Sequence, residues 1–396
     1  MPRRLIIGLL FCALCSQTYA LDDSARQQNR FCGAWIATVA NIDWPRPNTV
    51  GNPAQQEQDL INLIDSLSTL GINALIFQVR PTADALYQSS LEPISHWLTG
   101  KQTLSTTHQT PHTRHQTPHT THYFDPLEIV LREAHKRHME VHAWLNPFRV
   151  NINSMTVKDL APEHIFFRHP EWFWKYGEQY YFDPGLQETR DWICAVVKDI
   201  ITHYDVEAIH MDDYFYPYPI AGQTIPDQQT FRSHSRGITD IEDWRRDNVN
   251  LTIEQISATI RSTRPQVQFG ISPFGINATN YNSLYADILL WAEKGWIDYV
   301  IPQLYWPIEP DKPNTDYATL ATWWAKHLAP YQTALYTGHA VYRMRSGKAN
   351  SPWQQGDELI RQRLLNESLP KISGECYYSA KHIFNHPNVL LTEPLR

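Results

Sequence analysis

Two patterns of apolar residues alternate along the chain. Short apolar or alternating segments predict strands. Longer segments repeat an apolar residue every three or four positions, as amphipathic helices do. The clearest helical pattern has leucine or isoleucine at positions 60, 63, 64, 67 and 70, followed by Gly71, a usual residue at a helix C-terminus. Strands are predicted at residues 33–39, 74–79, 140–146, 206–212, 268–272, 298–304, 334–338 and 375–379. Further helices are predicted at residues 125–137, 188–204, 240–261, 283–295, 317–328 and 356–369.

Eight predicted strands and the helices between them follow one another in strict order. This order favours an α/β protein with a closed (β/α)8 barrel of the TIM type over an open sheet. We expect a single barrel over residues 31–396, with a long, partly disordered loop after the second strand. Only a short final helix, near residues 382–391, remains to follow the last strand.

The long loop contains a tandem repeat. His108-Gln-Thr-Pro-His-Thr-Arg114 recurs as His115-Gln-Thr-Pro-His-Thr-Thr121 within a segment rich in His and Thr over residues 100–122. Because this repeat is so polar, it cannot form part of a hydrophobic core. Its composition predicts a mobile, low-complexity insertion. Its histidines could bind a transition metal, but an insertion without a function is the favoured interpretation.

The N-terminal residues have the pattern of an export signal. Arg3 and Arg4 precede an apolar stretch that is too short to span a membrane, and small residues follow at 18 and 20. We expect a signal peptide at 1–20, a linker at 21–30, and export to the periplasm, outer membrane or cell envelope. The formal net charge of -7 argues against a nucleic-acid partner. The three cysteines after residue 20 show no disulfide or zinc spacing.

Polar and aromatic residues gather at the predicted C-terminal ends of the strands. Because side chains alternate between the two faces of a strand, the residues that face into the barrel can be predicted. They are Gln78, Arg80, His142, Trp144, Asn146, His210, Asp212, Gln303 and Tyr305. Barrel enzymes carry their active sites at this end. The chain also has 14 Trp and 20 Tyr, whose rings suit stacking on sugars, so we expect a polyol-binding cleft.

Two adjacent acids, Asp212 and Asp213, stand at the end of the fourth strand, just before an aromatic loop. Their repulsion and desolvation are unfavourable in a plain core, so they indicate function. Glycosidic cleavage usually needs one carboxylic acid to protonate the leaving oxygen and a second group at the sugar carbon. Candidates for a second carboxylate on nearby loops are Asp183, Asp84 and Asp43. Alternatively, the 2-acetamido group of a sugar could attack, with one aspartate orienting it and the other donating the proton. Glu375 starts the last strand, at the wrong end of the barrel, and is excluded.

Long stretches of the chain resemble a known bacterial family, the glycosyl-hydrolase-like barrels that include the envelope glycosidase of denuded peptidoglycan glycans. The stretches include Gly33-Ala-Trp-Ile-Ala-Thr38, Asn73-Ala-Leu-Ile-Phe-Gln-Val-Arg-Pro-Thr-Ala-Asp84, His142-Ala-Trp-Leu-Asn-Pro147, Tyr181-Phe-Asp-Pro-Gly185, Ile209-His-Met-Asp-Asp-Tyr-Phe-Tyr-Pro217, Asp243-Trp-Arg-Arg-Asp-Asn-Val249, Phe269-Gly-Ile-Ser-Pro-Phe-Gly275, Trp296-Ile-Asp-Tyr-Val-Ile-Pro-Gln-Leu-Tyr-Trp306 and Gly338-His-Ala340. Together they cover nearly all of residues 31–345. The histidine repeat departs from the family, and the lipoprotein cysteine of some relatives is not evident.

The resemblance implies an envelope enzyme that cleaves peptidoglycan strands after amidases have removed their stem peptides. The catalytic candidates are Asp212, Asp213, Asp183 and Asp84. The substrate-binding candidates are Arg80, His142, Trp144, Asn146, Arg149, His210, Tyr214, Tyr216, Gln303, Tyr305, Trp306 and His339. We expect neither a metal nor a cofactor.

Two other classes of function stay open from sequence. One is a metal-dependent polysaccharide hydrolase or deacetylase that would use His142, His210 and Asp212 to activate water. The other is a barrel that binds glycan without cleaving it, since sequence does not single out a second carboxylate.

Overall fold

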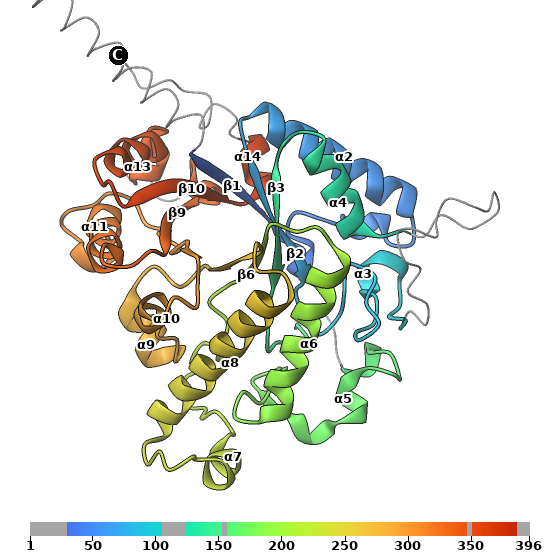
Figure 1. Cartoon of the computed structure of the whole chain (residues 1–396). Helices are drawn as coiled ribbons and strands as arrows, with labels where there is room; N and C mark the ends of the chain where they lie inside the picture. The colour runs from blue at the N-terminus through green and yellow to red at the C-terminus, as the bar shows by residue number, and fades with distance from the viewer. Residues whose placement is uncertain (1–29, 105–123, 153–156, 347–350, 386–396) are drawn as a thin grey trace, which may run out of the picture.

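The structure, a computed structural model, describes residues 30–104, 124–152, 157–346 and 351–385 (Figure 1). The predicted signal peptide, almost all of the linker, and the histidine repeat lie outside the described residues. So do the last residues of the predicted final helix.

Eight parallel strands form a closed barrel in the order β1-β10-β9-β8-β7-β6-β3-β2. Their bounds are β1 Phe31–Ile36, β2 Ala74–Arg80, β3 Glu140–Leu145, β6 Ala208–Met211, β7 Gln268–Ile271, β8 Tyr299–Val300, β9 Ala334–Ala340 and β10 Ile372–Tyr378. Each of them overlaps one predicted strand. The predicted (β/α)8 barrel is confirmed.

Helices surround the barrel, as Figure 1 shows. The longer ones are α2 Pro53–Thr69, α4 Pro126–His135, α6 Gln187–His203, α8 Ile241–Thr263, α11 Tyr317–Leu328 and α13 Glu358–Glu367. The shorter ones are α3 His96–Thr99, α5 Ile165–Arg168, α7 Gln228–Ser233, α9 Asn277–Ser283, α10 Ile288–Glu293, α12 Pro352–Gln355 and α14 Ala380–Asn385. No helix among the described residues is long and apolar enough to cross a membrane.

One predicted helix, at residues 283–295, is wrong in its bounds. The chain forms α9 and α10 instead, separated by a turn in which Tyr285 has a φ of +56°. Asp287 then caps α10, because its side chain accepts a hydrogen bond from the backbone N–H of Leu290 at 3.2 Å. The left-handed Tyr285 follows the end of α9, and the capping Asp287 begins α10. The apolar pattern of the sequence continues through both residues and does not reveal this break.

A small antiparallel hairpin, not predicted from the sequence, lies outside the barrel. It consists of β4 Phe173–Tyr176 and β5 Gln179–Phe182, with Gly177 at a φ of +58° in the turn. Tyr181 forms an isolated bridge with Arg149, which follows β3. The hairpin thereby comes to lie beside the C-terminal ends of the barrel strands.

The lower barrel interior is filled by aromatic and imidazole rings. Tyr299 fills the centre, and its hydroxyl group lies 2.8 Å from Nδ1 of His142 and 3.0 Å from Nδ1 of His210. Tyr299 leaves no room for a side chain at Gly270 on the paired strand β7, since a Cβ atom there would come within 1.8 Å of the Tyr299 ring. Burial lowers the pKa of His210 well below its usual value. These histidines therefore belong to a dry core beneath the mouth of the barrel.

Candidate active site

A pocket of about 410 Å³ opens at the C-terminal ends of the barrel strands. It is lined by Trp35, Val39, Ile42, Gln78, Trp144, Arg149, Ile152, Gln179, Asp212, Asp213, Tyr214, Ser272, Gln303, Tyr305 and Tyr378. The pocket combines two acids, one arginine, three side-chain amides, one serine hydroxyl group and several aromatic rings. Such a lining suits a polar ligand with apolar faces.

Asp212 is held by three N–H donors. Its Oδ1 accepts from Nδ2 of Asn146 at 3.0 Å and from the backbone N–H of Tyr214 at 3.1 Å. Its Oδ2 accepts from Nε1 of Trp144 at 3.1 Å. Burial raises the pKa of Asp212, while the charge of Arg149 and these three donors favour the ionised form. The carboxylate is fixed in orientation and supported as an anion.

Asp213 stands in a different environment. Burial and then the charge of Asp212 raise the pKa of Asp213 to about 7. Hydrogen bonds from the hydroxyl group of Tyr218 and the side chain of Gln303 oppose this rise. Two neighbouring carboxyls whose surroundings separate their pKa values can take the roles of acid and anion. The surroundings of the two groups therefore favour Asp213 as the protonated member of the pair.

Arg149 brings a positive charge to the pocket. Its guanidinium carbon lies 4.5 Å from the centre of the Tyr214 ring, so the ring fixes the plane of the cation. Its backbone N–H donates to Oδ1 of Asn146 at 3.0 Å, and its Nη1 reaches the carbonyl oxygen of Pro81 at 3.4 Å. No described residue accepts a hydrogen bond from its Nε or Nη2. Two donors of the fork are thus available to a ligand.

Gln78, on β2, presents another available donor. Its Oε1 accepts from the backbone N–H groups of Thr38 at 3.0 Å and Val39 at 2.8 Å, which fixes the orientation of the amide. Its Nε2 is buried and has no hydrogen-bond partner among the described residues. An unpaired buried N–H is unfavourable, so this donor is suited to an oxygen atom of a ligand.

Aromatic rings cover another side of the pocket. Tyr305 and Tyr378 line it with their ring centres 5.9 Å apart, and Tyr342 contacts both from outside. Trp35 donates from Nε1 to Nε2 of His210 at 3.3 Å. Because that bond ties Trp35 to the core, its ring is a firm part of the pocket floor.

The structure brings together seven of the predicted site residues in the pocket lining. They are Asp212, Asp213, Trp144, Arg149, Tyr214, Gln303 and Tyr305. Asn146 and His210 lie directly behind this lining, where they hold Asp212 and Trp35. The other predicted residues lie elsewhere.

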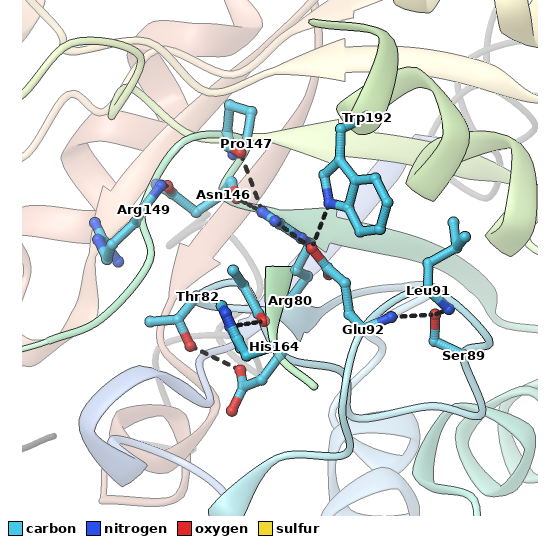
Figure 2. Close-up of polar contacts among 12 residues, drawn as sticks. Arg80, Thr82, Ser89, Leu91, Glu92, Asn146, Pro147, Arg149, His164 and Trp192 are labelled. Carbon is cyan, nitrogen blue, oxygen red and sulfur yellow. Dashed lines mark hydrogen bonds and ion pairs between the residues drawn. The ribbon is translucent and has the colours of Figure 1, made fainter. Parts of the chain in front are cut away.

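Arg80, predicted to bind substrate, is fully buried and does not line the pocket. Its Nε and Nη2 each donate to an oxygen of Glu92 at 2.6 Å, and its Nη1 donates to the carbonyl oxygen of Asn146 at 2.5 Å. Figure 2 shows Glu92 between Arg80 and Trp192, whose Nε1 donates to Oε1 of Glu92 at 3.2 Å. A register shift near the end of β2 turns Arg80 out of the barrel. Arg80 supports the loop after β3 instead.

Asp84 and Asp183 were predicted as catalytic candidates at the mouth of the barrel, but neither of them lines the pocket. Asp84 accepts from Oγ1 of Thr82 at 2.7 Å and from Nε2 of Gln102 at 3.4 Å. Asp183 accepts from the backbone N–H of Gly185 at 2.9 Å and from Oγ1 of Thr230 at 2.5 Å. Burial raises the pKa of both groups. Each carboxyl is hydrogen-bonded within the surrounding loops, and neither lines the pocket.

Asp43, the remaining candidate, anchors the region around α14. Its Oδ2 accepts from the backbone N–H of Ala37 at 2.7 Å. Its Oδ1 accepts from Oγ of Ser379 at 2.7 Å and from the backbone N–H of Lys381 at 2.8 Å. It does not line the pocket.

Four further predicted binding residues also lie outside the pocket lining. His142 and Tyr216 are buried inside the protein, and the Tyr216 hydroxyl group accepts from Nδ2 of Asn248 at 3.2 Å. His339 is buried outside the barrel, with its Nδ1 2.9 Å from Oε1 of Gln362 on α13. Trp306 lies behind Phe274, at 5.4 Å between ring centres. None of them lines the pocket.

Eight lining residues were absent from the predicted binding set. They are Trp35, Val39, Ile42, Gln78, Ile152, Gln179, Ser272 and Tyr378. Gln78, Ser272 and Tyr378 stand at or just after predicted strand ends, so the signal that selected Gln303 could have found them. Gln179 depends on the hairpin, whose aromatic residues on either side of Gly177 are its sequence signal.

The structure does not support the alternative of a metal-dependent hydrolase. In the described part of the chain, no three His, Cys, Asp or Glu side chains lie together in a way that could hold a metal ion. His142 and His210 both face Tyr299, whereas Asp212 faces Trp144 and Asn146.

A (β/α)8 barrel with paired carboxyls at its C-terminal mouth is an architecture of glycoside hydrolases. The model of the family described as "Glycosyl hydrolase-like 10" matches residues 30–355, and the chain belongs to this family.

Two curated relatives carry glycosyl hydrolase names. The chain is 38% identical to "Glycosyl hydrolase YngK" of Bacillus subtilis, over 92% of this chain and 71% of that protein. It is 35% identical to "Glycosyl hydrolase DigH" of Escherichia coli K12, over 89% of this chain and 83% of that protein.

Solved structures share the fold at low sequence identity. The glycoside hydrolase domain of PgaB (BpsB) from Bordetella bronchiseptica matches with a TM-score of 0.50 and 12% identity, covering 91% of this chain and 96% of that chain. Alpha-L-fucosidase isoenzyme 2 from Paenibacillus thiaminolyticus matches with a TM-score of 0.53 and 10% identity, covering 91% of this chain and 49% of that chain.

Proposed function

We propose that the protein is a glycosidase that cleaves peptidoglycan strands from which the stem peptides have been removed. The observation that carries this proposal is the asymmetric pair in the pocket. Asp212 accepts hydrogen bonds from three N–H donors, which favour its ionised form, and the pKa of its neighbour Asp213 rises to about 7. Membership of a glycosyl hydrolase-like family supports the reaction class.

Asp213 is the general acid in this proposal. Its proton passes to the oxygen of the leaving sugar as the bond from that oxygen to the anomeric carbon breaks. A group with a pKa near 7 retains its proton in neutral solution and releases it readily. Among the described residues, the pocket lining holds no third carboxyl that could attack the anomeric carbon.

The attacking group is then the acetamido oxygen of the substrate itself. A carboxylate has roughly four lone-pair sites. In Asp212, three of these sites already accept hydrogen bonds from N–H donors. The remaining site can accept the acetamido N–H, which directs the acetamido oxygen toward the anomeric carbon. That oxygen forms a bond to the carbon as the leaving group departs, and water activated by ionised Asp213 opens the cyclic intermediate. This route retains the configuration of the sugar.

Purified strands freed of peptides by an amidase provide the direct test. We expect soluble fragments by mass spectrometry and, by NMR, a first product of retained configuration. Intact sacculi at equal glycan concentration should be degraded much more slowly, because stem peptides obstruct a pocket that encloses the sugar. Binding of the strands without any fragment would instead make the protein a glycan-binding barrel, and inversion would exclude the acetamido route.

The proposed substrate places the protein in the cell envelope, after amidases in the order of reactions. The predicted signal at residues 1–20 supports export. N-terminal sequencing of the protein recovered from the periplasm or membrane fraction should find a start after Ala20. Recovery of full-length protein in the cytoplasm would contradict this location.

A further inference from the structure

The pocket has two sides with different chemistry. The acids Asp212 and Asp213 follow β6, whereas Gln78 on β2 and Arg149 after β3 present hydrogen-bond donors. The strands β2, β3 and β6 are neighbours in the barrel. A ligand that lies against the acids can therefore reach the donors.

The hydrogen-bond donors of Arg149 and Gln78 are not used by the acid pair, although the charge of Arg149 favours ionised Asp212. Of the described residues that line the pocket, Arg149 is the only cation, and it is 6% exposed. In Figure 2 its guanidinium group points away from the pair of Arg80 and Glu92. No described carboxylate forms a salt bridge with it, whereas Arg80 has Glu92 at 2.6 Å. The charge of Arg149 acts on Asp212, but its Nε and Nη2 donors have no acceptor among the described residues, and a carboxylate is the partner that such a fork fits best.

Gln78 is an independent observation that indicates the same ligand chemistry. Its side chain is fully buried, and its Nε2 has no acceptor among the described residues. Since Thr38 and Val39 fix its Oε1, the amide cannot rotate to satisfy Nε2 elsewhere without losing two hydrogen bonds. The unpaired N–H donors of this site therefore fit a ligand that presents acceptor oxygen atoms.

We propose that Arg149 and Gln78 form a carboxylate-binding site that recognises the free lactyl carboxylate of a muramic sugar. This inference rests on the proposed function and deepens it. An amidase releases that carboxylate when it cleaves the bond between the lactyl group and the stem peptide, whereas an uncleaved peptide leaves an uncharged amide. The enzyme thus selects denuded strands by charge as well as by space.

Two substrates separate charge from bulk. The first is the denuded strand, and the second is the same strand after carbodiimide coupling of its carboxylates to methylamine, which adds little volume and removes the charge. The wild-type protein should show a kcat/KM about 10- to 100-fold higher on the free carboxylate, the range of a charge-assisted hydrogen bond. Equal values for the two substrates would overturn the carboxylate site and leave the proposed function intact.

Variants then assign the selectivity to residues. Arg149→Met should bring the ratio of kcat/KM for the two substrates close to one, and Arg149→Lys, which keeps charge but not the fork, should give an intermediate ratio. Gln78→Glu keeps the acceptor for Thr38 and Val39 and removes the donor, so it should also lower the ratio. A matched control is Arg246→Met. A wild-type ratio in Arg149→Met would overturn the assignment.

Arg246 is a suitable control because it repeats the local packing outside the pocket. Its guanidinium carbon lies 4.4 Å from the centre of the Tyr281 ring. If Arg149→Met is too slow to assay, the ratio can be measured as binding constants in an Asp213→Asn background. In the wild-type protein, carboxylate-dependent binding without cleavage would support the site and refute the hydrolase, whereas neither binding nor cleavage of either substrate would refute both.

Discussion

Replacing Asp213 by Asn tests the role of the acid pair most directly. The variant keeps the size of the side chain and removes the proton that leaves with the glycosidic oxygen. Loss of a general acid slows a reaction about 10²- to 10⁴-fold. We therefore expect kcat on denuded strands to fall by at least about 100-fold in Asp213→Asn. The Asn side chain keeps an oxygen that can accept a hydrogen bond from Tyr218, so the fold should persist.

The same substitution should change stability in a way that depends on pH. The pKa of Asp213 rises from 3.8 to about 7, so the folded state binds the proton more tightly than the unfolded state. A difference of about three units corresponds to roughly 4 kcal/mol in the free energy of unfolding. This stabilisation is fully present below pH ~4 and is lost as the pH rises through about 7. Asn does not titrate, so Asp213→Asn should gain stability relative to wild type between pH 5 and pH 8.

The assay combines melting temperatures at pH 5 and pH 8 with the pH profile of kcat/KM. Wild-type activity should fall tenfold per pH unit above about 7, because Asp213 must be protonated. Asp212→Asn removes the charge that raises the pKa of Asp213, so its residual activity should decline at lower pH than in wild type. The reasoning would be refuted by wild-type turnover in Asp213→Asn, or by a melting-temperature difference that is the same at both pH values.

Three other substitutions or deletions have defined outcomes. Tyr218→Phe removes a hydrogen bond that lowers the pKa of Asp213, so the alkaline decline of kcat/KM should move to higher pH; a shift to lower pH would contradict this. Arg80→Met leaves Glu92 buried without its partner and should destabilise the protein by about 3–5 kcal/mol, measured by denaturant unfolding; a change below about 1 kcal/mol would show that water reaches the pair. Deleting residues 106–121 should leave melting temperature and kcat nearly unchanged, and activity that depends on added zinc only in the intact protein would revive a metal role for the repeat.

The order and position of the eight barrel strands could be predicted because each strand is buried and short and is followed by a turn signal. The hairpin β4–β5 was missed because aromatic residues occupy both of its faces, so it lacks the alternation that marks a half-buried strand. The turn between α9 and α10 was missed for a similar reason. There the apolar pattern continues through Tyr285, and only the capping role of Asp287 reveals the break.

The candidate site could be predicted where a strand keeps its regular alternation up to its end. β6 and β3 do so, and they deliver Asp212 and Trp144 to the pocket as expected. β2 does not, since its register shifts between Gln78 and Arg80, and a shift of one residue exchanges the two faces of a strand. Periodicity therefore assigned Arg80 to the wrong side. A bulge depends on the neighbouring strand and is not visible in the period of one segment.

The positions of the donors and acids together predict which bond is cleaved. In a muramic sugar the acetamido group and the lactyl group stand on neighbouring ring carbons, so one ring can place the acetamido group at Asp212 and the lactyl carboxylate at Arg149. The charge of Arg149 acts on Asp212, as this close placement requires. That ring carries the anomeric carbon that is attacked, and Asp213 protonates the oxygen of the next sugar. Each cleavage should therefore create a reducing end on a muramic sugar. Borohydride reduction of the products followed by mass spectrometry should find muramitol, and glucosaminitol as the main reduced sugar would show that the neighbouring sugar occupies the catalytic position instead.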